Sequence, residues 1–339
     1  MARFDPTLDT PTTAFPTRYP ADARPLFDTP VPGNGYCWWY LDGLSDDEDF
    51  GITLIVFVGS VFSPYYAWAR RREGNANATD FVSVNVALYR RRGRGRWAMT
   101  ERNAASLERS KDHYRLGSSA LEWHNDHLRI RINERCAPFG DELKGDITLQ
   151  PLCATTEGLI LNPKGGHRWQ AIAPAARLRV DFKTPGWRWD GTGYLDHNRG
   201  DEPLEAGFDY WTWSRQHRKA ASGTETFVTY DFWQRGGERG CAAPRFDTHG
   251  GLTLDPAIEP ASRLANGLWG VARTTRMAGA TIAQGFEDTP FYTRSLLDHP
   301  DGPAVFECLD LKRFSSRWVQ TLLPFRMPRW TRPVTPLPS

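Results

Sequence analysis

A chain of 339 residues, with 40% hydrophobic side chains, can bury a sizeable core as two domains or as one large β architecture. Its 42 basic residues nearly balance its 40 acidic residues, which argues against a nucleic acid as the main partner. Aromatic residues are frequent, with 14 Trp, 18 Phe and 11 Tyr, and this composition favours rigid walls or interfaces over an adaptable groove.

The N-terminal residues 1–32 carry repeated Pro, Thr and Asp, which predicts an extended arm lying on the body of the protein. Residues 102–112 have the composition of a turn or a short helix. The remaining signals are strands rich in aromatic and β-branched residues, flanked by turn residues. They fall on Tyr36–Leu41, Ile52–Phe57, Phe81–Tyr89, Trp97–Met99, Ala120–Trp123, Leu128–Ile132, Leu178–Phe182, Tyr210–Ser214, Glu225–Trp233 and Leu268–Thr274.

Short strands at this spacing favour an all-β protein, built as antiparallel sandwiches or barrels rather than βαβ units. The turn-like stretch Lys183–Gly186 suggests a domain boundary. We therefore expect an arm at 1–32, a first β domain at 33–186, a second β domain at 187–325 and a Pro-rich tail at 326–339.

The five cysteines show no CxxC spacing, and an odd number cannot all pair within one chain. We expect free, mostly buried thiols in a reduced compartment. The N-terminus has no apolar run after a basic start, so no secretory signal is expected. The longest apolar run, residues 52–62, is too short to cross a bilayer as a helix. A soluble or peripheral cytoplasmic protein is the expectation.

Several familiar catalytic and binding motifs are missing from the sequence, among them the P-loop, GxGxxG after a strand and the helical HExxH. Ser60 and Ser63 do not form a GxSxG elbow, which disfavours serine hydrolysis. The pair His124 and His127 is more typical of a hairpin turn than of a metal site. The acidic run 46–49 lacks the spaced oxygens of an EF-hand, so we expect no bound metal.

The densest polar and aromatic region runs from Gly165 to Trp213. In an extended strand, residues two apart point to the same face, so His167 shares a face with Trp169 and Tyr194 with Asp196. Each pair joins a titratable group to an aromatic ring. The alternative is a solvated turn, in which Asp196 bonds nearby backbone.

Protonation of an alkene needs this combination of groups. A C=C bond is a weak base, so it needs a carboxylic acid that burial keeps protonated. The resulting carbocation is stabilised by aromatic faces. A water then attacks, assisted by a base such as neutral His. Asp196 lies close in sequence to His197, Arg199 and Asp201. If those groups share its pocket, an ion pair would keep Asp196 ionised.

Two basic and aromatic segments, Trp68–Arg72 and Tyr89–Trp97, suit the surface of an anionic membrane. A charge run that is simply solvated explains them equally well. The sequence is consistent both with solvated charge runs and with an anionic membrane surface as a candidate partner.

Five segments of the chain are long and idiosyncratic: Gly35–Asp47, Phe57–Arg70, Asn85–Tyr89, Arg96–Arg102 and Tyr194–Glu205. They closely resemble the carotenoid 1,2-hydratases, also called hydroxyneurosporene synthases, and the resemblance covers residues from about 33 to at least 235. It implies a lyase without cofactor or metal that hydrates the C1=C2 bond of acyclic carotenoids such as neurosporene and lycopene. It also implies two lipocalin-like β-barrels packed side by side, and a peripheral location at the inner or intracytoplasmic membrane.

The family's functional HxW and YxD pairs fall on His167 and Trp169, and on Tyr194 and Asp196. The implied mechanism has Asp196 protonate C2, while Trp169 and Tyr194 stabilise the cation at C1 and His167 positions or deprotonates water. Two other functions remain open. One is a non-enzymatic carrier of a carotenoid or another lipid, and the other is a cyclase on the same scaffold.

Overall fold

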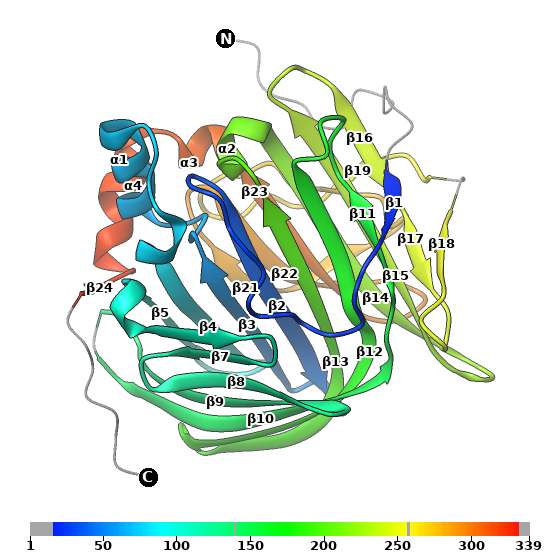
Figure 1. Cartoon of the computed structure of the whole chain (residues 1–339). Coiled ribbons are helices and arrows are strands. Elements are labelled where there is room, and N and C mark those ends of the chain that lie inside the picture. Colours follow the sequence, from blue (N-terminus) through cyan, green and yellow to red (C-terminus); the bar gives the residue numbers. More distant parts are fainter. Residues whose placement is uncertain (1–15, 139, 256–257, 332–339) are drawn as a thin grey trace. The chain divides into compact units, whose positions relative to one another are not determined.

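The computed structural model describes residues 16–138, 140–255 and 258–331. The chain divides into two compact units. The large unit comprises Tyr19–Gly158, Gly166–Pro203 and Gln320–Ser339, and the small unit comprises Met1–Arg18, Leu159–Gly165 and Leu204–Val319. Strands dominate both units, as Figure 1 shows, which confirms the all-β prediction.

The large unit is built on a 14-stranded, mainly antiparallel sheet. Strand β11 (Glu157–Ile160) pairs with β12, and β1 (Thr17–Pro20) pairs with β11. The other strands follow one path, in the spatial order β24 (Arg329–Trp330), β5 (Arg96–Arg102), β4 (Val82–Arg90), β3 (Phe50–Val58), β2 (Tyr36–Ser45), β13 (Trp187–Gly200), β12 (His167–Thr184), β10 (Glu142–Cys153), β9 (His127–Arg135), β8 (Ser119–His124), β7 (His113–Leu116) and β6 (Leu107–Ser110).

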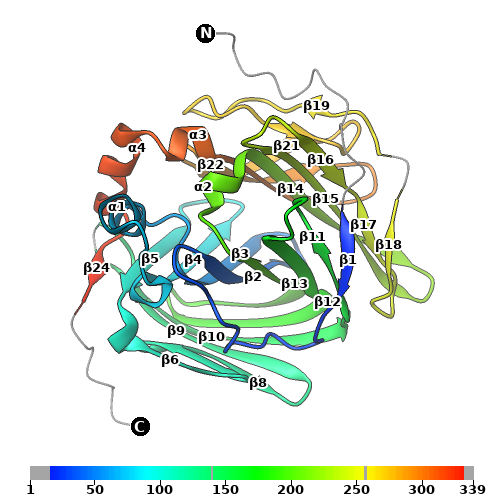
Figure 2. The ribbon, with the colours of Figure 1, turned by 45° about the horizontal axis from the view of Figure 1, so that its top comes forward.

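The sheet of the large unit curls around an apolar core. Tyr114 on β7 donates its hydroxyl to the carbonyl of Phe57 on β3 at 3.1 Å, so these two strands face each other across the core. In Figure 2, β9 and β10 pass beneath β2 and β3. Phe27, fully buried, closes the core with its ring 5.1 Å from that of Trp39. This part of the expected N-terminal arm therefore lies on the body, and residues 1–15 lie outside the described residues.

Strands β12 and β13 form one long hairpin, turned at Gly186 with φ of +87°. The expected boundary between residues 186 and 187 falls at this turn, and both strands belong to the large unit. The chain instead passes into the small unit between Pro203 and Leu204. The pair His167 and Trp169 and the pair Tyr194 and Asp196 consequently lie on neighbouring strands of one sheet.

The small unit contains an eight-stranded sheet and a two-stranded sheet. Its core includes Tyr210, Trp233, Leu297 and Phe306. The larger sheet has the order β18 (Leu252–Leu254), β17 (Pro244–Phe246), β15 (Gly223–Gln234), β14 (Phe208–Ala220), β23 (Ala304–Asp310), β22 (Tyr292–Asp298) and β21 (Thr281–Asp288), with β16 (Arg239–Ala242) on β15, and the smaller sheet pairs β19 (Ser262–Arg263) with β20 (Thr274–Thr275).

The helices are short, and the longest was not predicted. Helix α1 (Pro64–Glu73) begins where Ser63 Oγ accepts a hydrogen bond from the backbone of Tyr66 at 3.0 Å, with Pro64 in the first turn. No helix in the described ranges is long and apolar enough to cross a membrane. The other helices are α2 (Leu204–Gly207), α3 (Leu311–Phe314) and α4 (Arg317–Leu322), with 3₁₀ turns at Ala78–Asp80, Ala104–Ser106 and Leu323–Phe325.

Most of the expected strands are present, and one is wrong. The segment Leu268–Thr274 forms a turn and a loop, and only Thr274 begins a strand. Gly270 has φ of +63°, a conformation that ends a strand. Residues 102–112 contain a 3₁₀ turn followed by β6. All five cysteines are free and buried, as predicted.

Candidate active site

Asp196 lies near the end of β13 with only 2% of its surface exposed. Its Oδ2 atom accepts two hydrogen bonds of 2.9 Å, one from Trp169 Nε1 and one from the Tyr194 hydroxyl. Its Oδ1 atom accepts a longer hydrogen bond, 3.4 Å, from Asn198 Nδ2. Three of the four predicted site residues therefore meet at one carboxyl group.

Strand alternation and cross-strand pairing bring these groups together. Tyr194, Asp196 and Asn198 point to the same face of β13 because they are two residues apart. On the neighbouring strand β12, Trp169 is the direct partner of Asn198, which brings its indole within reach of Asp196. The solvated-turn alternative is wrong for Asp196, since this residue is buried within a strand.

His167 occupies a different place in the cluster. It pairs with Gly200, which lies four residues beyond Asp196, or about 13 Å along an extended strand. Its Nδ1 hydrogen-bonds the Tyr36 hydroxyl at 2.7 Å, and its Nε2 lies 3.1 Å from Glu202 Oε1. Burial lowers the pKa of His167, and the carboxylate of Glu202 opposes this shift. The lowered pKa favours a neutral imidazole, which lies at the edge of the site and links Tyr36 to Glu202.

Glycine at position 200 is required by this packing. A Cβ atom there would lie 2.3 Å from Tyr36 Cε1 and 2.9 Å from His167 Nδ1. Real side chains do not tolerate such distances, so the close approach of the Tyr36 and His167 rings depends on the absence of a side chain at Gly200.

Strand β2 adds an aromatic wall to the same face. Tyr36 and Trp38 stack with ring centroids 4.9 Å apart, and the Trp38 and Phe57 centroids are 6.0 Å apart. Tyr40 meets Tyr194 edge to face at 6.2 Å. These rings supply the electron-rich surfaces that stabilise a cation.

The opposite face of β13 belongs to the core of the large unit. His197 stacks on Trp39 at 5.1 Å, and its Nε2 lies 3.0 Å from the Cys37 sulfur. Burial, with a smaller effect of Arg199, lowers the pKa of His197 to about 3, so the imidazole is neutral. Asp201 is exposed to solvent. Alternation thus directs His197 and Arg199 away from the face that carries Asp196.

Four residues of β2 belong to the site, although the sequence reasoning did not choose them: Tyr36, Trp38, Tyr40 and Asp42. All four are buried, and Tyr40 donates its hydroxyl to Asp42 Oδ2 at 2.9 Å. The alternation of positions 36, 38, 40 and 42 was a usable signal, because it places aromatic and acidic side chains on one face. The pairing of β2 with β13 could not be derived from that pattern.

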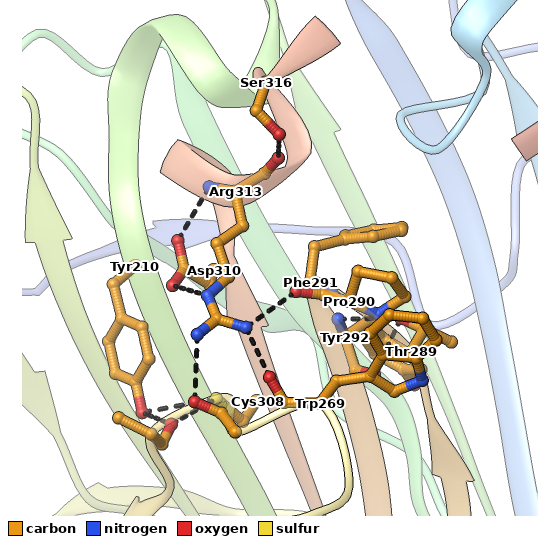
Figure 3. Close-up of polar contacts among 12 residues, drawn as sticks. Tyr210, Trp269, Thr289, Pro290, Phe291, Tyr292, Cys308, Asp310, Arg313 and Ser316 are labelled. Atoms are coloured by element: carbon orange, nitrogen blue, oxygen red, sulfur yellow. Dashed lines mark hydrogen bonds and ion pairs between the residues drawn. The ribbon is translucent and has the colours of Figure 1, made fainter. Parts of the chain in front are cut away.

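The small unit has an open cleft lined in part by Trp269, Asp310 and Arg313. Arg313 on α3 donates to the carbonyls of Trp269, Gly270 and Pro290 at 2.7, 3.0 and 3.2 Å. Figure 3 shows Arg313 beside Trp269 and Pro290. Asp310 caps the start of the same helix by accepting from the Arg313 backbone at 2.9 Å. These contacts give Arg313 and Asp310 a structural role, whereas the four predicted site residues all lie in the large unit.

Within the described ranges, no cluster of three or more His, Cys, Asp or Glu side chains has the arrangement of a metal site. His124 and His127 lie at an exposed hairpin, where each bonds a neighbouring carboxylate. Asp46, in the acidic run, makes a two-pronged ion pair with Arg177 at 2.7 Å for both contacts.

Comparison with known proteins points to one family. A family model described as carotenoid hydratase CrtC matches residues 54–335. The chain is 43% identical over 312 residues to the acyclic carotenoid 1,2-hydratase of Thiocapsa roseopersicina, a match that covers 90% of this chain and 76% of that protein. It is 40% identical over 314 residues to the enzyme of the same name from Rubrivivax gelatinosus, with the same coverage of 90% and 76%.

A solved structure supports the fold. The chain resembles a protein from Nitrosomonas europaea described as AttH, with a TM-score of 0.54 and 13% sequence identity. The match covers 81% of this chain and 92% of that one. At this identity the likeness shows a shared lipocalin-like β fold.

Proposed function

Because the chain belongs to the CrtC carotenoid hydratase family, we propose that it adds water to the terminal C1=C2 bond of an acyclic carotenoid such as neurosporene or lycopene. The product is a 1-hydroxy carotenoid. The chain is a hydro-lyase in this assignment, and Asp196 is its acid. The buried contact of Asp196 with Trp169 and Tyr194 is the observation that carries the proposal.

The hydrogen bonds of Asp196 suggest where its proton resides. Oδ2 already accepts from Trp169 and Tyr194, so the proton belongs on Oδ1. Transfer of that proton to C2 leaves a tertiary cation at C1. The two donors on Oδ2 then stabilise the carboxylate that remains, which lowers the cost of the transfer.

The aromatic residues would stabilise the cation. The faces of Trp169, Tyr194, Tyr40 and Trp38 offer the negative side of their quadrupoles. His167 holds Tyr36 at 2.7 Å, and Tyr36 stacks on Trp38. We therefore assign His167 a positioning role toward the aromatic wall.

The reaction is tested with purified protein and lycopene-loaded vesicles, with the 1-hydroxy product followed by chromatography. The wild type should form product. The rate of product formation should be lower by roughly 100-fold or more in Asp196→Asn, because this change removes the catalytic acid. Asp190→Asn is the matched control, because Asp190 lies on the same strand with its side chain 57% exposed. Equal rates in Asp196→Asn and wild type would contradict the acid assignment.

Two rival functions give different results in the same assay. A carrier would bind lycopene and release it unchanged. A cyclase would trap the cation internally, so product formed in H₂¹⁸O would carry no label, whereas hydration places the label in the hydroxyl group. Labelled 1-hydroxy product therefore separates the proposal from both alternatives.

We also propose that the large unit associates peripherally with a membrane, where its apolar substrate dissolves. Trp68 on α1 is 40% exposed, and Arg71 and Arg72 beside it are exposed. The second basic segment supports this less well, because Tyr89 is buried and the Trp97 ring lies under Arg326 at 4.5 Å.

Sedimentation with anionic vesicles tests the membrane proposal. The double change Arg71→Gln and Arg72→Gln should weaken binding, by about 1 kcal/mol for each arginine at the surface. The double change Arg179→Gln and Arg188→Gln is the control, since both side chains are 77% exposed elsewhere on the large unit. Equal binding of the two variants would contradict a contact through α1.

A further inference from the structure

The site contains a second copy of its own acid motif. Tyr40-Leu41-Asp42 on β2 repeats the Tyr194-Leu195-Asp196 of β13, and the two strands run antiparallel. Their register places Tyr40 opposite Asp196 and Asp42 opposite Tyr194. Each tyrosine donates its hydroxyl to the aspartate of its own strand at 2.9 Å. The two tripeptides are thus related by a local twofold arrangement.

Both carboxyl groups of this arrangement are buried on one face. Asp42 is 1% exposed and Asp196 is 2% exposed. They are diagonal neighbours across the strand pair, a relationship that places the two residues about 7–8 Å apart and their Cβ atoms somewhat closer. Inverting glycosidases hold a water between an acid and a base whose carboxyl groups are about 6.5–9.5 Å apart, and carboxyl groups on diagonal neighbours can take a comparable separation.

The contacts of the two carboxyl groups differ. Asp196 accepts from an indole, a phenol and an amide, of which the indole comes from β12. Asp42 accepts from Tyr40, and its other direct neighbour across the sheet is Thr53 on β3.

Hydration requires both an acid and a base. We propose that Asp42 is the base that takes the proton from the attacking water, an assignment that rests on the proposed function of Asp196 as the acid. Asp196 gives its proton to C2, the water oxygen bonds to C1, and the proton released by that water goes to Asp42. The products are a tertiary alcohol, a neutral Asp42 and an ionised Asp196. Return of the proton from Asp42 to Asp196 restores the starting state.

This assignment predicts that protonation and water capture can be separated. Without the base, the C1 cation forms but returns its C2 proton to Asp196 and reverts to substrate. In D₂O the acid carries deuterium, so each futile cycle can leave deuterium at C2 of recovered lycopene. Asp42→Asn should therefore lower hydration by roughly 100-fold or more while exchange into lycopene continues. Asp196→Asn should abolish both.

The measurement is mass spectrometry of lycopene and product after incubation in D₂O, with circular dichroism to verify folding. Asp190→Asn serves as the control and should match the wild type in both readouts. Hydration at the wild-type rate in Asp42→Asn overturns the assignment. Loss of both exchange and hydration in a folded Asp42→Asn variant also overturns it, because a base for water is not needed to protonate the alkene.

A second variant covers the case in which Asp42→Asn does not fold. Asp42→Glu keeps a carboxylate at this position, so its ratio of hydration to exchange should stay within about tenfold of wild type. A larger fall in that ratio overturns the assignment. Failure of the proposed function has a different signature, because the wild type itself then forms no hydroxylated product or Asp196→Asn retains full activity.

Discussion

The indole of Trp169 donates a 2.9 Å hydrogen bond to the carboxyl group of Asp196, from one strand of a hairpin to the other. A hydrogen bond to a charged group contributes about 1.5–3 kcal/mol, and this one stabilises the carboxylate that remains after proton transfer. Trp169→Phe keeps an aromatic face and removes the donor. We expect its kcat/KM for hydration to fall roughly 10–100-fold.

The control for Trp169→Phe is Trp123→Phe, a change of the same kind in the half-buried Trp123 of β8. This control should hydrate lycopene at the wild-type rate. An unchanged rate in Trp169→Phe itself would show that the indole contributes only packing.

Gly200 should be among the least tolerant glycines of the large unit. Gly200→Ala drives a methyl group against Tyr36 and His167, and overpacking of this kind costs about 1–3 kcal/mol. The expected result is a lower melting temperature together with a lower rate of hydration. Gly236→Ala is the control, because no atom lies within 4 Å of its Cβ position. Equal melting temperatures for the two variants would contradict the packing at Gly200.

The stability of the chain should depend on pH through His197. Its pKa is about 3 in the folded chain against an ordinary value of 6.5, chiefly because burial disfavours the charged imidazolium. Between these values the unfolded chain binds more protons. The free energy of unfolding should therefore fall as the pH falls from 6.5 to 3, by up to about 5 kcal/mol.

Urea unfolding of wild type and His197→Asn at several pH values measures this contribution. The variant loses the stack on Trp39 and should be less stable at neutral pH, but its stability should depend less steeply on pH between 6.5 and 3. His124→Asn, at an exposed position, should leave the slope unchanged. Parallel pH profiles for His197→Asn and wild type would argue against a buried neutral imidazole.

Arg313 should stabilise the loop that carries Trp269 in the small unit. Its guanidinium bonds three backbone carbonyls, which the single ammonium of lysine cannot reach together. Arg313→Lys should destabilise the chain by about 0.5–1.5 kcal/mol, because these exposed or partly buried carbonyls lose hydrogen bonds. Protease cleavage at this loop should also become faster. Lys312→Arg, one residue away, should change neither property, and equal cleavage rates in the two variants would contradict this role.

The all-β class and the shared face of Tyr194 and Asp196 could be predicted because both depend on local pattern. Alternation put Tyr194 and Asp196 on one face of a strand, and the structure places them there. Helix α1 was missed, although Ser63 and Pro64 are a helix-start signal, since three arginines obscure any apolar stripe. The strand expected at Leu268–Thr274 is a turn and a loop, because Gly270 has φ of +63°, which interrupts an extended strand.

Asp42 could not be singled out in this way. Its part in the site depends on the pairing of β2 with β13, two strands separated by more than 140 residues of sequence. Alternation says which face a side chain takes, but the partner strand is set by how the whole sheet assembles. The sequence therefore predicted the candidate residues on the β12–β13 hairpin, and the candidate residues on β2 stayed outside that prediction.

The two strand pairs differ in sequence separation, since β12 and β13 are consecutive and β2 is distant from both. This difference implies an order in which the site forms during folding. The contact between Trp169 and Asp196 needs only the closure of a hairpin, an event of microseconds. Asp42 arrives when β2 docks, which closes a loop of well over a hundred residues and is slow for entropic reasons. On refolding, the contact of Trp169 with Asp196 should form before turnover recovers, so the proposed acid would be in place before the proposed base.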